Sequence, residues 1–350
     1  MRNMKTHILF IALLVPFLVA CSTDVDLYAD YKDVPIIYGL ISAKSDTNYI
    51  KITRAFCGDD DNPINAVEVA QVYDSSNYPG KLDVFIDELK KTNDQQYQFT
   101  GRRFYLDTLT IHNKKEGLFY SPHQKLYYTT ERFNTKNGND KYRYKLYVVK
   151  PDADTVTSET NIVDANISVG VSIVNFQSAP SDVNSRLIFS STEDAVLYEI
   201  GMRFYYWEGH PGQPFTKKEV SWSFGIRPIT AYERVEGTTN LHWLYYSVNS
   251  LFNVMENAIG NDTVWDENHP NVIRYIDDFV VSITAAGEDL HNYYQTIQEM
   301  QNGLNQMSSY SNIKGGYGLF SSYILVSNTV RLSSGAKHDL FRKPWGFRER

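Results

Sequence analysis

Cysteine is scarce in this chain, whose 350 residues include only Cys21 and Cys57. At most one disulfide bond can therefore form within one copy of the chain. Basic residues are also in deficit, with 34 Lys and Arg against 41 Asp and Glu and a formal net charge of −7. This balance argues against a nucleic-acid-binding protein, which normally carries a basic face. Because 42% of the residues are hydrophobic, wholesale disorder is excluded as well.

Motifs of catalysis and metal binding are missing too. The eight histidines are scattered, and none has the spacing of a metal site. The sequence contains no Gly-x-Ser-x-Gly elbow and no kinase or P-loop signature. The acidic pairs Glu116 with Glu131 and Asp277 with Asp278 resemble ordinary surface acids rather than a glycosidase pair. We therefore predict no catalytic residue, no metal ion and no cofactor.

Aromatic residues, by contrast, are abundant, with 26 Tyr, 18 Phe and 5 Trp. Together with many β-branched residues they favour strands. Residues 34–41 form a nearly continuous apolar run, which predicts a strand buried on both faces. Further short strands follow, with turn signals about every 8–12 residues. We therefore expect a mainly β fold that begins with an immunoglobulin-like β-sandwich over residues 34–165.

The remaining residues, 166–350, differ because they contain all five tryptophans. Long strands are predicted there, and two segments near 244–258 and 288–301 have apolar residues at helical spacing. We expect a β-rich C-terminal domain with about two helices. The glycine-rich residues 315–318 lead into a predicted strand and not into a helix. We interpret them as a turn or bulge where backbones approach closely, and not as a phosphate loop.

The N-terminus is the most specific segment. Two basic residues precede an apolar run over residues 8–20. About 13 residues cannot span a hydrocarbon core of ~30 Å, so the run predicts a signal peptide over residues 1–20. It ends in Leu18-Val19-Ala20-Cys21, which resembles the lipobox of bacterial lipoproteins. The resemblance implies cleavage after residue 20, a lipid anchor on Cys21 with acyl chains such as palmitate, and a tether over residues 21–33. The alternative is an ordinary signal peptide followed by a chance cysteine.

Cleavage changes the charge and the cysteine count. Without residues 1–20, which hold two basic residues and no acidic one, 32 basic residues face 41 acidic ones, a net charge of −9. Cys57 then has no cysteine partner, and we interpret it as a small buried or half-buried thiol. Ser22 does not resemble the aspartate that retains lipoproteins in the inner membrane, so the outer membrane is favoured. Asp24 and Asp26 resemble the signal that sends Bacteroidota lipoproteins to the cell surface, and the periplasmic face is the alternative.

Aromatic side chains provide the one binding signal in the sequence. Exposed rings stack on the faces of sugars, and four residues of the second half are candidates for such a platform: Tyr205, Trp207, Trp222 and Trp243. The alternative is that these rings pack in the core or across strands. An exposed row of tryptophans would favour ligand binding, and fully buried rings would favour a structural role.

Three blocks of the chain carry a wider resemblance: residues 34–40, 49–56 and 310–322. They are similar to blocks of a group of uncharacterised Bacteroidota lipoproteins. Members of this family of unknown function are often encoded beside TonB-dependent outer-membrane receptors. The resemblance implies an outer-membrane setting in the cell envelope and a link to nutrient uptake. It supplies no catalytic residue.

These observations predict a lipid-anchored, non-enzymatic accessory protein of the cell envelope. Its expected partners are a TonB-dependent receptor or a glycan or peptide ligand, and the outer membrane through the lipid anchor. One alternative is a structural or adhesive surface lipoprotein in which the sandwich is a spacer. The other is a hydrolase without a recognisable motif.

Overall fold

The computed structural model describes residues 33–55, 68–136, 138–151, 154–170, 173–174, 184–259, 272–302 and 310–349. The predicted signal peptide, Cys21 and Cys57 lie outside the described residues. Residues 34–350 group as one compact unit. Among the described residues, no helix is long and apolar enough to cross a membrane.

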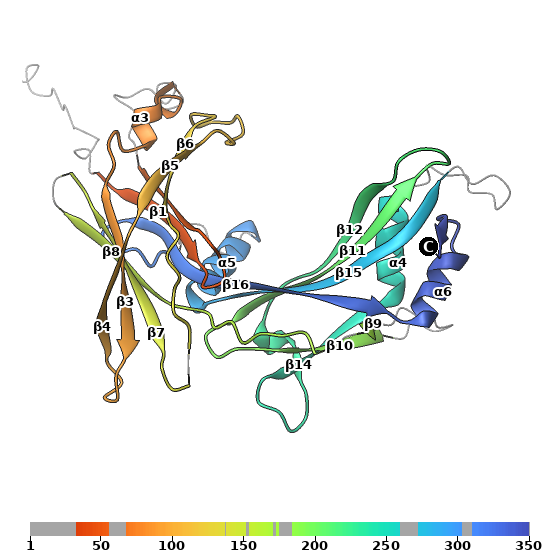
Figure 1. The fold of residues 1–350 in the computed structure, drawn as a ribbon. Helices are drawn as coiled ribbons and strands as arrows, with labels where there is room; N and C mark the ends of the chain where they lie inside the picture. Colours follow the sequence, from red (N-terminus) through yellow and green to blue (C-terminus); the bar gives the residue numbers. More distant parts are fainter. Residues whose placement is uncertain are drawn as a thin grey trace, which may run out of the picture. The chain divides into compact units, whose positions relative to one another are not determined.

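The fold is mainly β, as the composition predicts (Figure 1). The first strands are β1 (Pro35–Ile41), β2 (Asn48–Arg54), β3 (Asp83–Lys91), β4 (Tyr97–Tyr105), β5 (Asp107–Ile111), β6 (Gln124–Thr129), β7 (Tyr142–Val149) and β8 (Thr155–Asn161). The later strands are β9 (Ile173–Val174), β10 (Asn184–Ser190), β11 (Leu197–Gly209), β12 (Thr216–Pro228), β13 (Glu233–Arg234), β14 (Leu241–Ser247), β15 (Ile273–Ala286), β16 (Tyr317–Leu332) and β17 (Phe347–Arg348). The helices are α3 (Tyr73–Ser76), α4 (Val248–Ile259), α5 (Glu288–Gln301), α6 (Ser334–Arg342) and the 3₁₀ turn η2 (Ile229–Ala231).

Three sheets organise these strands. The ten-stranded sheet has the order β12-β11-β15-β16-β1-β2-β6-β5, with β17 beside β15 and β9 beside β16. A four-stranded sheet has the order β4-β3-β7-β8, and a three-stranded sheet the order β10-β14-β13. Neighbours in the main path of the ten-stranded sheet are antiparallel except for β1 and β16, which are parallel.

The N-terminal strands form two layers around one apolar cluster. The layers are the four-stranded sheet and the β1-β2-β6-β5 part of the ten-stranded sheet. Ile37 and Ile52 come from the second layer, and Ile86 and Leu146 from the first, and all four side chains belong to the same buried cluster. Buried residues alternate along β7, as expected for a strand with one face in a core. The immunoglobulin-like character of this sandwich stays a prediction.

A buried carboxylate holds the four-stranded sheet to the segment that follows β6. Glu88 is 1% exposed and accepts hydrogen bonds from the Tyr144 hydroxyl at 2.9 Å, from Asn134 Nδ2 at 2.9 Å and from Arg102 Nη1 at 3.0 Å. Burial, followed by the negative charge of Glu88, raises the pKa of Tyr144. Since a buried charge is tolerated only when it is paired and hydrogen-bonded, this network fixes the strands that meet at Glu88.

The second apolar cluster lies against strands β11, β15 and β16, and helices α4 and α6 contribute Leu251, Met255 and Leu340 to it. The predicted helix near 288–301 corresponds to α5, and the one near 244–258 to α4. Residues 244–247, however, belong to β14, in which His242, Leu244 and Tyr246 are the buried residues. Leu244 fits the alternation of a strand as well as the spacing of a helix. The spacing of apolar residues alone therefore does not locate the boundary between β14 and α4.

Strand β16 joins the two clusters. Its first part pairs with β1, from Ile36↔Tyr317 to Ile41↔Ser322, and its second part pairs with β15. The N-terminal cluster otherwise ends at Ile162, but it includes Ile313 and Phe320 because of this pairing. Residues 310–322 therefore pack with the sandwich, although the predicted division assigns them to residues 166–350.

The glycine-rich residues before β16 lie against the backbone of β1. A Cβ atom on Gly318 would be 1.9 Å from the carbonyl oxygen of Ile37, and one on Gly316 would be 2.6 Å from that of Pro35. Gly318 also has a φ of +115°, which L side chains rarely adopt. The predicted close approach of backbones at residues 315–318 is confirmed.

Candidate binding surface

The four aromatic residues predicted as a platform do not lie on one surface, although Tyr205 and Trp207 share a face of β11. Along β11, Phe204 and Tyr206 are buried, so Tyr205 and Trp207 lie on the opposite face of the strand. The Lys217 ammonium lies 4.8 Å from the centre of the Tyr205 ring and 5.9 Å from that of Trp207. Its Nζ also pairs with Asp277 Oδ2 at 2.6 Å. This cation holds the pKa of the Asp277 carboxyl below its usual value and lies against both rings.

The other two rings contact different neighbours. Trp222 of β12 packs against the C-terminal cluster, with its ring centre 4.4 Å from that of Phe224. Trp243 belongs to β14 in the three-stranded sheet, where the Arg186 guanidinium lies 4.2 Å from its ring centre. All four predicted rings are partly buried, so they form neither an exposed row nor a closed core.

Exposed aromatic residues gather instead on the outer face of β1. In this strand Ile37 and Ile41 are fully buried, whereas Tyr38 is 44% and Leu40 38% exposed. The prediction that residues 34–41 are buried on both faces is therefore wrong. The side chains of the outer face are apolar nonetheless. We call the following set the tyrosine surface: Tyr38, Leu40, Tyr293, Met300, Tyr310 and Tyr317.

A groove of about 300 Å³ runs through the tyrosine surface between β1, the start of β16 and α5. The rings of Tyr38 and Tyr293 meet edge to face with their centres 6.2 Å apart. The Tyr310 hydroxyl donates to Asp289 Oδ1 at 2.7 Å. A hydrogen bond with Tyr293, followed by burial, raises the pKa of Tyr38 to about 12, and burial followed by the contact with Asp289 raises that of Tyr310 to about 12. Both phenols are therefore neutral at physiological pH.

Buried serines fix helix α5 beside β16. The backbone N–H of Gly287 donates to the carbonyl of Ser322 at 3.0 Å, and that of Leu290 donates to Ser321 Oγ at 3.2 Å. Ser322 Oγ in turn donates to the carbonyl of Asn161 at 2.6 Å. Both serine side chains are fully buried. The face of α5 that carries Tyr293 is therefore placed by specific contacts to the sandwich.

The loop that carries Tyr310 is fixed in the same way. Asn312 pairs with the backbone of Phe320 through both side-chain atoms, at 2.7 and 2.9 Å. Its carbonyl accepts from Ser158 Oγ at 2.9 Å, and Lys314 exchanges two backbone hydrogen bonds with Thr157. The groove is thus formed by anchored elements, which is the usual property of a binding site.

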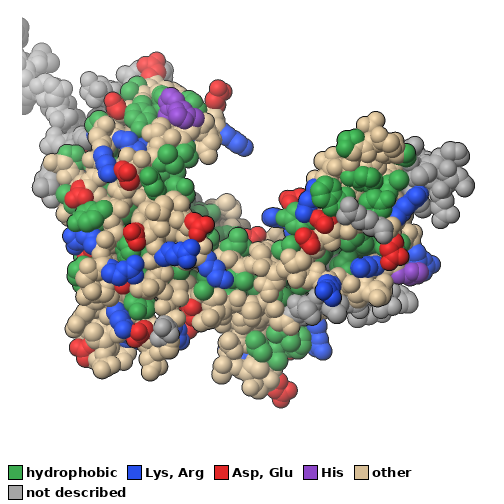
Figure 2. All heavy atoms as spheres, viewed as in Figure 1, with side chains coloured by type: hydrophobic (Ala, Val, Ile, Leu, Met, Phe, Trp, Pro, Cys, Tyr) green, Lys and Arg blue, Asp and Glu red, His purple; other side chains and the backbone are tan. Residues whose placement is uncertain are grey.

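The outer face of the four-stranded sheet has a different character. Charged side chains of both signs spread over β3, β4 and β7 (Figure 2). Examples are Arg103 with Asp87 at 2.6 Å and Lys145 with Glu159 at 3.1 Å. Such a mixed, paired surface is typical of a face in contact with water.

One serine–histidine pair bears on the hydrolase alternative. Ser191 Oγ lies 3.1 Å from His242 Nε2, beside a polar cleft of about 630 Å³. Burial lowers the pKa of His242, which favours the neutral imidazole. Its Nδ1 atom, however, has no hydrogen-bond partner among the described residues. A serine hydrolase needs an acceptor at this nitrogen to orient the ring.

The backbone around Ser191 is occupied as well. Its N–H donates to the carbonyl of Asn240 at 2.7 Å, and the N–H of Thr192 donates to the Tyr198 hydroxyl at 3.1 Å. Neither group can serve as an oxyanion donor in this geometry. The described part of the chain also holds no group of three or more His, Cys, Asp or Glu side chains that could bind a metal ion.

The sequence already held a signal for the groove. Apolar residues at both alternating positions of residues 34–41 indicated two apolar faces, and the described residues cover only one of these. Tyr38, Tyr310 and Tyr317 also lie within residues 34–40 and 310–322, two of the blocks on which the predicted family resemblance rests. What the sequence could not indicate is that α5 places Tyr293 beside them. No protein-family model matches the chain, and a comparison with curated proteins finds no similar sequence.

Proposed function

We propose that this protein is a lipid-anchored, non-enzymatic component of the bacterial cell envelope whose tyrosine surface binds an outer-membrane transport receptor. The observation that carries the proposal is the aromatic groove between β1, β16 and α5, which is anchored on both sides and which no other described residue covers. Exposed apolar patches of this kind mark interaction sites on soluble domains. Tyr and Met are enriched at protein interfaces, and Tyr is frequent among the residues that dominate binding energy.

The sequence supports a membrane-proximal position for this surface. We infer from the resemblance to a lipobox that the lipid is attached to Cys21, and the compact unit begins at Val34. A tether over residues 22–33 reaches at most about 40 Å when fully extended. A receptor in the same membrane would therefore meet the tyrosine surface at a high effective concentration. The spacer alternative requires no such apolar surface, which is why we favour receptor binding.

Removal of the lipidation site tests the lipid anchor. We expect Cys21→Ala to move the full-length protein from the membrane fraction to the soluble fraction, because the acyl chains supply the membrane affinity. Cys57→Ala is the matched control and is expected to stay in the membrane fraction. Fractionation followed by immunoblotting measures the distribution.

The partner is identified by purifying the tagged, full-length protein from native membranes. We expect a TonB-dependent receptor to be recovered in amounts comparable to the protein itself. The Cys57→Ala protein serves as the check that the protein is still anchored in these membranes. If the anchored protein is recovered without any outer-membrane receptor, receptor binding is refuted and the spacer alternative is favoured.

A further inference from the structure

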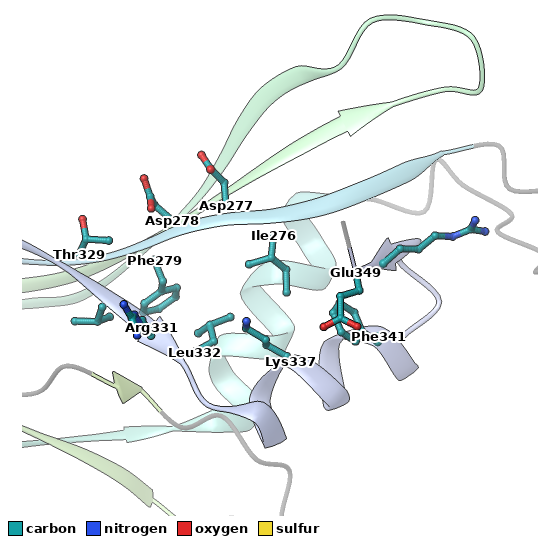
Figure 3. A pocket seen from close by; sticks show the side chains of 12 residues that line it. Ile276, Asp277, Asp278, Phe279, Thr329, Arg331, Leu332, Lys337, Phe341 and Glu349 are labelled. Atoms are coloured by element: carbon teal, nitrogen blue, oxygen red, sulfur yellow. The ribbon is translucent and has the colours of Figure 1, made fainter.

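A second cavity, of about 480 Å³, lies beside β15 at the point where its pairing with β16 has ended and its pairing with β17 has not begun (Figure 3). The last pair between β15 and β16 is Phe279↔Val330, and β17 pairs only with Arg274 and Tyr275. Residues 276–278 therefore have no partner strand on this side among the described strands. The cavity occupies this interruption and is bounded by helix α6 and by the residues around β17.

The walls combine apolar groups with charged groups, most of them cationic on the side that faces the cavity. Ile276 and Phe341 are half-buried and supply apolar surface. Arg331 comes from the end of β16, and Lys337 projects from α6 toward β15 (Figure 3). Glu349 lies beside Phe341 in the same view. A site of this size with a few polar groups on apolar walls suits a small organic ligand.

Two cationic side chains of the lining, Arg331 and Lys337, are the groups that suit an anion. Arg331 and Lys337 are exposed, and neither side chain makes an ion pair within the part of the chain that the structure describes. Asp277 and Asp278 also line the cavity, but their side chains point to the other side of β15 in Figure 3. Asp277 is moreover paired with Lys217 at 2.6 Å. The cavity thus presents two cations that have no ion pair among the described residues, and Arg348 and the carboxylate Glu349 also belong to its lining.

The wall formed by β17 is fixed by a buried arginine. The Arg274 side chain is 2% exposed and pairs with Glu208 Oε2 at 2.7 Å. Its Nη1 also donates to the carbonyl of Trp345 at 2.7 Å. Phe347, which follows in β17, is buried in the C-terminal cluster. Contacts within the protein therefore hold this wall of the cavity in place.

We propose that this cavity binds a small organic anion, with its carboxylate or phosphate group between Arg331 and Lys337 and its apolar part against Ile276 and Phe341. Each kind of contact is weak alone, because exposed charges are screened by water and a short apolar chain buries little area. Their combination in one cavity selects ligands that carry both groups. The proposal is independent of receptor binding by the tyrosine surface.

Calorimetric titration of the full-length protein in lipid nanodiscs tests the proposal, with empty nanodiscs as the blank. The probes are hexanoate, hexyl phosphate, hexanol and inorganic phosphate. We expect saturable binding of hexanoate or hexyl phosphate, and the tighter of the two identifies the anionic group. Hexanol and inorganic phosphate are expected to bind at least tenfold more weakly.

The combined substitution of Arg331→Gln and Lys337→Gln is expected to weaken binding of the anionic probes by at least tenfold. Arg342→Gln in the same helix α6 is the control, because Arg342 is exposed and does not line the cavity. The proposal is overturned if neither anionic probe binds, or if hexanol or inorganic phosphate binds as tightly as they do. It is also overturned if the double variant retains the affinity of the control.

Discussion

Gly318→Ala is expected to destabilise the protein by about 3–5 kcal/mol, since it combines backbone strain with a steric clash. The added Cβ would lie 1.9 Å from the carbonyl oxygen of Ile37 and 2.8 Å from its carbonyl carbon. Both atoms belong to the backbone of β1, so no flexible side chain can move aside. The φ of +115° adds a further cost for any residue with a Cβ. Chemical denaturation followed by circular dichroism measures the loss.

Gly117→Ala is the matched control for this substitution. Gly117 has a negative or extended φ, and a Cβ built on it has no atom within 4 Å. We expect the free energy of unfolding to change by less than about 0.5 kcal/mol. If the two variants are equally stable, β16 does not enter the sheet against β1 as described. The consequence would extend to the tyrosine surface, because this pairing brings Tyr317 opposite Ile36 and two residues from Tyr38.

The double substitution of Tyr38→Ala and Tyr293→Ala is expected to abolish recovery of the receptor. Truncating one central interface residue typically costs about 2 kcal/mol, and two such losses correspond to roughly a thousandfold weaker binding if they add. The two rings contact each other edge to face in the groove, so the double variant removes its centre. The measurement is the amount of receptor that co-purifies with the full-length protein from native membranes.

Tyr105→Ala provides the control for this variant. Tyr105 lies in β4 of the four-stranded sheet and is 64% exposed, so it matches the substituted residues in type but not in position. Recovery of the receptor is expected to be unchanged. If the double variant, shown to be folded by its denaturation curve, recovers as much receptor as Tyr105→Ala, the tyrosine surface is not the binding site.

Local features of the fold were readable in the sequence. The aromatic and β-branched composition predicted the β fold, and the glycines at 315–318 predicted a close approach that the Gly318 geometry bears out. The bounds of α5 agree with the predicted segment 288–301 because Gly287 stops the preceding strand and two acidic residues follow it. Such signals depend only on residues that are close in the sequence, so they can be recognised without knowledge of the tertiary structure.

The pairing of strands that are far apart in the sequence could not be predicted. Nothing in the sequence shows that β16 continues from a parallel pair with β1 into an antiparallel pair with β15. For the same reason the sequence did not indicate the tyrosine surface as a whole. The composition drew attention to Trp207 and Trp222. Whether a strand residue faces water or the core depends on its register in the sheet. In the structure Lys217 lies against Trp207 and Phe224 against Trp222, and both rings are partly buried. Tyr293 joins the groove only because two buried serines of β16 hold α5 there.

Photo-crosslinking tests the central claim most directly. A photoreactive amino acid is placed at position 317 of the full-length protein, where Tyr317 is 60% exposed, and at position 105, where Tyr105 is 64% exposed. Both variants are irradiated in intact cells, and the adducts are identified by mass spectrometry. Receptor binding by the tyrosine surface predicts an adduct with a TonB-dependent receptor from position 317 and none from position 105. An adduct with the receptor from position 105 alone, or no receptor adduct from position 317, would contradict it.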